Sequence, residues 1–219
     1  MEAAADQAEI DRICDEAISH GFASVCVNGR FVARVAAQLA GGPVKTCAVV
    51  GFPLGANSTA IKCAEAVRAC TDGADEIDFV AALPTLASRR VEDAIQEWTP
   101  IVESARNANE LIVVKVIIES AALISGVEDV EAEARISAAC EAARFSGCDF
   151  VKTSTGFHPA GGASICAVRW MCFHGAGMRV KASGGIRTVQ DAANMIEAGA
   201  DRVGCSASVS IMGQLGRMP

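Results

Sequence analysis

The chain alternates between two kinds of segment from end to end, and this alternation constrains its fold more than any single residue does. Short runs of apolar and β-branched residues have the composition of buried strands. The runs are Ser24–Val27, Lys45–Val50, Glu76–Val80, Leu111–Ile118, Phe150–Ser154, Val180–Ser183 and Arg202–Cys205. They predict seven strands.

Longer segments with apolar residues at three- and four-residue spacing surround these runs, which is typical of helices that cover a sheet. The predicted helices are Gln7–Ser19, Arg30–Leu39, Ser58–Thr71, Arg90–Asn107, Val127–Ser146, Ala163–His174 and Thr188–Glu197. Several end just before a glycine and the next strand, as at Gly21, Gly73, Gly147 and Gly199, which is a common way for a helix to terminate. Strands joined by helical crossovers predict a parallel sheet.

Polar residues inside the predicted strands distinguish between two parallel-sheet folds, a (β/α)8 TIM barrel and an open doubly wound sheet. Asp78, Lys115, Lys152 and Lys181 each lie within a strand near its carboxyl half, the end at which barrel enzymes place their chemistry. No Gly-x-Gly-x-x-Gly motif follows the first strand, which weakens the dinucleotide-binding alternative. We therefore expect one α/β barrel domain over residues 1–219.

The barrel that we expect is one strand short at its N-terminal end, because a helix precedes the first strand run. Removing a barrel strand would leave two unpaired edges and an apolar slot open to water. A truncated gene model, an isoform and a strand supplied by a partner subunit are the alternatives. We favour a truncated start at Met1.

Composition argues against several classes of function. A net charge of −7 and the lack of tyrosine predict no nucleic-acid surface. No apolar run is long enough for a membrane span, and the acidic N-terminus does not resemble a signal peptide. Ten cysteines without a Cys-x-x-Cys pair favour reduced thiols in a cytoplasmic protein over a zinc site. We expect Cys26, Cys47 and Cys205 to act as small apolar core residues.

Lys152 is the strongest candidate for a reactive group. It points to the opposite face of its strand from Val151 and Thr153, and inside a barrel desolvation would lower its pKa. An unprotonated lysine attacks a carbonyl carbon and forms a Schiff base. Lys181 lies on the next strand, and two ammonium groups about 6 Å apart repel by roughly 3 kcal/mol at an effective dielectric of about 20, or about two pKa units. The alternative is that both lysines stay protonated beside a carboxylate, or that Lys152 reaches solvent.

Asp78 is the carboxylate that could pair with these lysines. It shares a strand face with Glu76, opposite to Ile77 and Phe79, and an acidic group inside a barrel requires a partner. Such a group could also relay protons. We expect Lys115 to have a supporting role, in which it neutralises Asp78 and fixes its position.

Small residues after three late strands predict an anion site, because they allow backbone N–H groups and helix N-termini to approach a phosphate. These segments are Thr155-Gly156, Ser183-Gly184-Gly185 and Gly204-Cys205-Ser206. Each glycine alone is weak support, since loops commonly contain glycine.

Motifs along most of the chain, from residue 7 to about 213, resemble those of the deoxyribose-phosphate aldolases, a family of class I aldolases. The matching segments are residues 21–28, 51–57, 73–78, 115–119, 150–157 and 180–188. Taken together and in this order, these motifs are highly specific.

The resemblance implies reversible cleavage of 2-deoxy-D-ribose 5-phosphate to acetaldehyde and D-glyceraldehyde 3-phosphate, a step of deoxyribonucleotide catabolism. Lys152 matches the Schiff-base lysine, Lys181 the second lysine that lowers the pKa of the first, and Asp78 the proton-relay aspartate. The phosphate loops match at Gly156, Gly184, Gly185, Gly204 and Ser206, and Lys115, Thr155 and Cys26 are supporting candidates. No metal or organic cofactor is implied, because the iminium is the electron sink, and a homodimer is compatible with such barrels.

Four departures from the family pattern leave other functions open. The first-strand Asp-His-Thr-Leu-Leu motif is absent, residues 80–84 lack the usual Asn and Gly, Gly29 replaces a proline, and Ala207 replaces a serine found in some members. The alternatives are a catalytically impaired relative with a binding or scaffold role, and a barrel lyase or isomerase acting on another sugar phosphate. Retention of Asp78, Lys152 and Lys181 favours an active aldolase.

Overall fold

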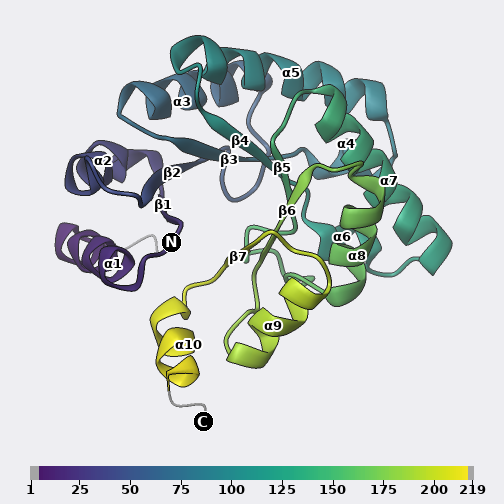
Figure 1. Ribbon diagram of the computed structural model, residues 1–219. Coiled ribbons are helices and arrows are strands. Elements are labelled where there is room, and N and C mark those ends of the chain that lie inside the picture. Colours follow the sequence, from purple (N-terminus) through teal and green to yellow (C-terminus); the bar gives the residue numbers. More distant parts are fainter. Residues whose placement is uncertain (1–4, 217–219) are drawn as a thin grey trace.

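Seven parallel strands form one curled sheet and pair strictly in chain order (Figure 1). This computed structural model describes residues 5–216, so the questioned start at Met1 lies outside the described residues. The strands are β1 (Ser24–Val27), β2 (Lys45–Val50), β3 (Glu76–Val80), β4 (Val113–Ile117), β5 (Phe150–Lys152), β6 (Arg179–Ser183) and β7 (Arg202–Gly204). The predicted parallel α/β architecture is confirmed, with β1 and β7 as the edges of a partly closed barrel.

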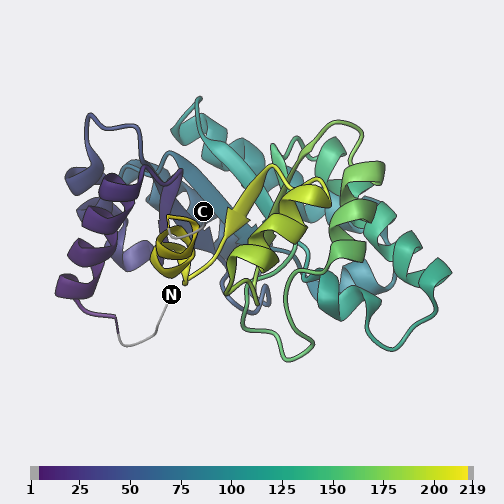
Figure 2. The same cartoon turned by 60° about the horizontal axis from the view of Figure 1, so that its bottom comes forward.

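Helices cover the outer face of the sheet (Figures 1 and 2). They are α1 (Gln7–His20), α2 (Val32–Leu39), α3 (Thr59–Thr71), α4 (Leu83–Ala87), α5 (Val91–Ala108), α6 (Ser120–Ile124), α7 (Asp129–Phe145), α8 (Ile165–His174), α9 (Val189–Glu197) and α10 (Ser208–Leu215), with a 3₁₀ turn at Gly29–Phe31. The predicted helices and strands are all present, with ends within two residues of the expected positions. Within residues 5–216, no helix is both long and apolar enough to cross a membrane.

Three helices, α4, α6 and α10, lie in segments for which the sequence predicted neither a helix nor a strand. The first two are five residues long, which is too short for a helical period to show in the sequence. Helix α10 contains Gly213 and polar residues, so its sequence has a weak helical pattern. Its contacts with α1 and α9 stabilise it as a helix. The first and last helices therefore lie side by side at the open side of the sheet (Figure 2).

The two faces of each strand enter different environments, as the alternation in β3 illustrates. Ile77 and Phe79 are fully buried in the apolar layer between sheet and helices, where the ring of Phe79 meets Trp98 of α5 edge-on at a centroid distance of 6.0 Å. Glu76 and Asp78 are buried on the other face, where they contact cationic side chains. The predicted division of β3 into an apolar and an acidic face is thus confirmed.

Glycine ends the helices as predicted. Gly21 after α1 has φ +63°, and its N–H donates to the carbonyl groups of Ala17 and Ile18. Gly147 after α7 likewise has φ +78°. A residue with a side chain would be strained in this left-handed conformation, so these glycines fix the point at which each helix turns into the following strand.

We predict that Phe79→Ala lowers the free energy of unfolding by about 3 to 5 kcal/mol, because it leaves a cavity against Trp98. Urea denaturation followed by circular dichroism measures the change. The control is Phe173→Ala, which removes an aromatic ring that is 78% exposed and should change stability by no more than about 0.5 kcal/mol. Equal effects of the two variants would contradict the packing described here.

Candidate active site

Strand register brings the predicted charged residues together inside the sheet. Asp78 of β3 lies opposite Lys115 of β4, and Lys152 of β5 lies opposite Lys181 of β6. Residues opposite each other in adjacent parallel strands point to the same face. The four side chains therefore project into one interior space, and all four are at most 4% exposed.

Asp78 is the centre of this cluster. Its Oδ2 accepts hydrogen bonds from Lys152 Nζ and Lys181 Nζ, each at 2.7 Å, and its Oδ1 accepts one from Lys115 Nζ at 2.8 Å. Because the Nζ atoms of Lys152 and Lys181 share one oxygen, they are separated by no more than twice 2.7 Å. The predicted contact of Lys115 with Asp78 is present.

The lysines lower the pKa of Asp78, and Asp78 in turn raises the pKa of Lys181. Burial alone would raise the pKa of Asp78, but the positive charges of Lys115, Lys152 and Lys181 outweigh it and hold the pKa well below its usual range. Burial would lower the pKa of Lys181, and the charge of Asp78 reverses this and raises it. Asp78 is therefore an ionised carboxylate, and Lys181 is an ammonium group at neutral pH.

A second layer of charge lies beneath this cluster, toward the amino ends of the strands. Glu76 accepts hydrogen bonds from Lys115 Nζ at 2.7 Å and from Arg202 Nη1 of β7 at 2.8 and 2.7 Å. The guanidinium groups of Arg179 and Arg202 lie 4.1 and 5.2 Å from the ring centroid of Phe150. Lys115 is thus held by two carboxylates, which fits a supporting role.

Sequence reasoning missed Arg202 and gave Glu76 no role in the site. Glu76 lies two residues before Asp78 on the same strand, so strand phase alone could have placed it in the interior. Arg202 gives a weaker signal, since a strand-end arginine usually reaches solvent. Its contact with Glu76 joins β7 to β3, and only the curvature of the sheet makes it possible.

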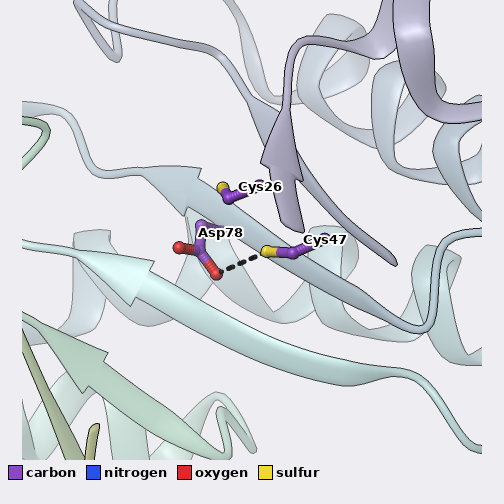
Figure 3. Close-up of side chains that lie close together, drawn as sticks. All are labelled: Cys26, Cys47 and Asp78. Atoms are coloured by element: carbon purple, nitrogen blue, oxygen red, sulfur yellow. Dashed lines mark hydrogen bonds between the residues drawn. The ribbon is translucent and has the colours of Figure 1, made fainter. Parts of the chain in front are cut away.

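Cys26 and Cys47 occupy the same interior space, opposite each other on β1 and β2 (Figure 3). Cys47 Sγ donates a hydrogen bond to Asp78 Oδ1 at 3.3 Å. The expectation that both thiols belong to the apolar core is therefore wrong, because their strand phase directs them toward the charged interior. Cys205, by contrast, packs against the apolar core as predicted. Interaction with Cys47 lowers the pKa of Cys26 to about 6.

The ligand atoms of Cys26, Cys47 and Asp78 lie within 4.8 Å of one another, a spacing that suits a metal ion. Both oxygens of Asp78, however, already accept hydrogen bonds from lysine ammonium groups. A cation at this position would have to displace these groups and would face their positive charges. We therefore assign no metal to the three residues.

The loops after β5 and β6 meet above the lysines. Thr153 Oγ1 and Ser154 Oγ donate to the carbonyl oxygen of Ser183 at 3.0 and 2.6 Å, and Ser183 Oγ donates to that of Ser154 at 2.6 Å. Gly184 lies so close to this pair that a Cβ atom there would be 2.5 Å from Ser154 Oγ. The close approach brings the predicted loop at Gly156 next to Gly184.

Three further predicted site residues, Gly204, Ser206 and Thr155, lie at the ends of β7 and β5 or in the loops that follow them. A Cβ atom at Gly204 would lie 3.2 Å from Cε of Lys181, so this glycine leaves room for the lysine side chain. Ser206 is exposed in the turn before α10. Thr155, whose N–H donates to the carboxylate of Glu119 at 2.6 Å, lies in the loop after β5. Sequence reasoning did not single out Glu119.

Two surface hollows, of about 330 and 350 Å³, lie at the opposite end of the sheet. One is lined by Asp149 and Arg179 at the amino ends of β5 and β6, and the other by Thr46 and Asp75 near those of β2 and β3. The lysine cluster lies toward the carboxyl ends, where parallel barrels carry their chemistry. We therefore assign the functional site to the cluster.

Comparisons with known proteins agree with this geometry. Residues 1–215 match the family described as DeoC/LacD family aldolase. The deoxyribose-phosphate aldolase of Carboxydothermus hydrogenoformans is 46% identical over 213 residues, which are 97% of this chain and 90% of the relative.

Solved structures give the same result. A tetrameric deoxyribose phosphate aldolase from Aeropyrum pernix has a TM-score of 0.87 and 30% identity, with 99% of this chain and 87% of that chain covered. The aldolase QR15 has a TM-score of 0.85 and 36% identity, with 99% of this chain and 91% of that chain covered.

We predict that Lys115→Met lowers the free energy of unfolding by about 3 to 5 kcal/mol, because it leaves buried carboxylates without their shared partner. Burial would lower the pKa of Lys115, but Asp78 and Glu76 raise it. The contribution of Lys115 is therefore complete below its unfolded pKa of about 10.4 and is lost as the pH rises through the raised folded value.

The stability difference between wild type and Lys115→Met should thus stay constant from about pH 7 to pH 10. Denaturant titrations across this range measure it. Lys45→Met, which removes an exposed lysine of β2, is the control and should change stability by no more than about 0.5 kcal/mol. A difference that vanishes by about pH 8 would contradict the raised pKa of Lys115.

Proposed function

The chain belongs to the DeoC/LacD family of aldolases, and from this premise we propose that it cleaves 2-deoxy-D-ribose 5-phosphate to acetaldehyde and D-glyceraldehyde 3-phosphate, reversibly, through a Schiff base on Lys152. The names of the similar proteins support the substrate. The observation that carries the mechanism is the sharing of one oxygen of Asp78 by two buried lysines.

In the proposed reaction, the Nζ atom of Lys152 attacks the C1 aldehyde of the open-chain sugar. The carbinolamine then loses water and becomes a protonated Schiff base. The C2–C3 bond breaks, its electron pair moves into the iminium to give an enamine, and the C3 hydroxyl loses its proton to become the aldehyde of glyceraldehyde 3-phosphate. Protonation at C2 and hydrolysis release acetaldehyde and restore Lys152. The iminium accepts the electron pair, so the scheme uses no metal or organic cofactor.

Asp78 and Lys181 have distinct roles in this scheme. Lys152 must lose a proton before it attacks, and Asp78 Oδ2 is 2.7 Å from its Nζ. Lys181 Nζ lies at the same distance from the same oxygen, so one carboxylate oxygen connects the two amines. We assign to Lys181 the ammonium group that protonates the leaving hydroxyl of the carbinolamine, and to Asp78 the orientation of both amines and the transfer of protons between them.

We assign the phosphate to the glycine loops after β5, β6 and β7. Gly156, Gly184 and Gly185 all have positive φ angles, of +83°, +85° and +79°, and such turns can direct backbone N–H groups toward an anion. No atom lies within 4 Å of the Cβ position of Gly185 among the described residues, which leaves space for a ligand. Gly204 and Ser206 complete the proposed site.

The cellular location, the substrate class and the oligomeric state are part of the same proposal. We propose one barrel domain that works in the cytoplasm, where its ten free thiols remain reduced. A sugar phosphate, rather than a nucleic acid or a membrane, is the proposed partner. The tetramer of the Aeropyrum pernix relative supports self-association, and size-exclusion chromatography distinguishes a dimer from a tetramer.

We predict that Lys152→Ala abolishes turnover and covalent labelling, because it removes the nucleophile. Borohydride reduction with substrate, followed by mass spectrometry of peptides, measures the label. Lys181→Leu should keep the label on Lys152 but lower the rate at pH 7, with recovery as the pH rises. A label on another lysine in the wild type would overturn the assignment. A folded wild type without label or turnover would favour the non-catalytic alternative.

We predict that Ser206→Asp lowers kcat/KM for the phosphorylated sugar by about tenfold, because like charges about 6 Å apart repel by roughly 1.4 kcal/mol at an effective dielectric of about 40. Activity on 2-deoxy-D-ribose, which lacks the phosphate, should stay within a factor of about two. Ser210→Asp, at an exposed serine of α10, is the matched control. Equal losses with both sugars would move the phosphate site elsewhere.

A further inference from the structure

Glu119, at the junction of β4 and α6, has an unfavourable backbone conformation. Its φ and ψ angles are 49° and 55°, in the left-handed region. A residue with a side chain pays about 1 to 2 kcal/mol for this conformation. Strained residues persist where the surrounding contacts enforce them, and they cluster at functional sites.

The carboxylate of Glu119 is also unusual, because it is buried without a counter-ion. The residue is 2% exposed, and in the part of the chain that the structure describes no cationic side chain lies within salt-bridge distance. Its Oε2 has no hydrogen-bond partner among residues 5–216. Burying an unpaired carboxylate costs free energy, so this side chain is not explained by fold stability.

The other carboxylate oxygen points to the reactive strand. Glu119 Oε1 accepts a hydrogen bond of 2.6 Å from the backbone N–H of Thr155. Its chain neighbours hold the same segment, since Ile118 N donates to the carbonyl oxygen of Lys152 at 3.0 Å and Ser120 N to that of Thr153 at 2.7 Å. The corner at residues 118–120 thus holds the chain from Lys152 to Thr155 by three hydrogen bonds.

The opposite side of this segment is held by β6, through the hydrogen bonds between Ser183 and the side chains of Thr153 and Ser154. These contacts end at Ser154. The bond from Thr155 N–H to Glu119 is therefore the last restraint before Gly156, where the chain turns into the glycine loop.

We propose that Glu119 is a positioning residue for the aldolase site, which fixes the end of β5 so that Lys152 is aimed into the interior and the loop at Gly156 is held open for the phosphate. The proposal rests on the function proposed above. It accounts together for the left-handed backbone, the buried carboxylate and the hydrogen bond to Thr155. A misplacement of about 1 Å in such a site can cost about a hundredfold in rate.

Three substitutions separate the effect of the Glu119 side chain from the effect of its strained backbone conformation. Glu119→Gln keeps an oxygen that can accept from Thr155, so the rate of borohydride trapping of acetaldehyde on Lys152 should stay within about threefold of wild type. Glu119→Ala loses the acceptor and keeps the strain, whereas Glu119→Gly loses the acceptor and relieves the strain. Both should trap acetaldehyde about 10 to 100 times more slowly, and Glu119→Gly should melt at a temperature equal to or above that of Glu119→Ala.

Ala176→Gly is the matched control. Ala176 also has a positive φ, of +49°, and it is exposed on the loop between α8 and β6. Its replacement should raise the melting temperature slightly and leave the trapping rate unchanged. Strain relief at a positive φ is thereby separated from loss of the Thr155 contact.

Hydrogen exchange provides a readout that does not depend on catalysis. The amide of Thr155 should exchange at least about tenfold faster in Glu119→Gly than in wild type or Glu119→Gln, because its acceptor is lost. Unchanged exchange at Thr155, or trapping at the wild-type rate in both Glu119→Ala and Glu119→Gly, would overturn the positioning role. A wild type that shows no trapping would instead overturn the proposed function, and the exchange result would still decide whether Glu119 holds the loop.

Discussion

The interior of this protein depends on one buried carboxylate. Asp78 accepts hydrogen bonds from three lysines that lie on three different strands, and without it these buried basic groups would have no shared anionic partner. The apolar layer outside the sheet stabilises the fold, whereas this anion allows the inner face to be charged. The cost of burying the lysines is offset by their ion pairs with Asp78.

The charge balance of the interior extends beyond Asp78. Glu76 of β3 accepts hydrogen bonds from Lys115 of β4 and from Arg202 of β7, so its carboxylate connects the middle of the sheet to the edge strand. The two acids and the four basic side chains leave an excess of basic groups in the interior. The same set of side chains therefore balances the buried charge and lines the candidate site.

Much of the fold could be predicted from the sequence, because strand and helix patterns repeat and glycines mark the helix ends. The faces of β3 and the meeting of Asp78 with Lys115, Lys152 and Lys181 followed from the two-residue period of strands. The contact between Arg202 and Glu76 could not be predicted in this way, since it depends on curvature across several strands. The positions of the thiols could not be predicted from residue type, because cysteine is apolar in most cores. The register places Cys26 opposite Cys47 and Cys47 opposite Glu76, on the charged face of the sheet. Glu119 could not be predicted as a site residue, because the sequence does not show that its backbone has a left-handed conformation.

The opposition of Lys152 and Lys181 in the register of β5 and β6 has a consequence for how the chain assembles. Because side chains alternate along a strand, a slip of β5 by one residue would send Lys152 into the apolar layer and Val151 into the charged interior. The contact of Lys152 with Asp78 thus depends on correct strand pairing, and a refolding chain regains this contact only after β5 and β6 have paired in register.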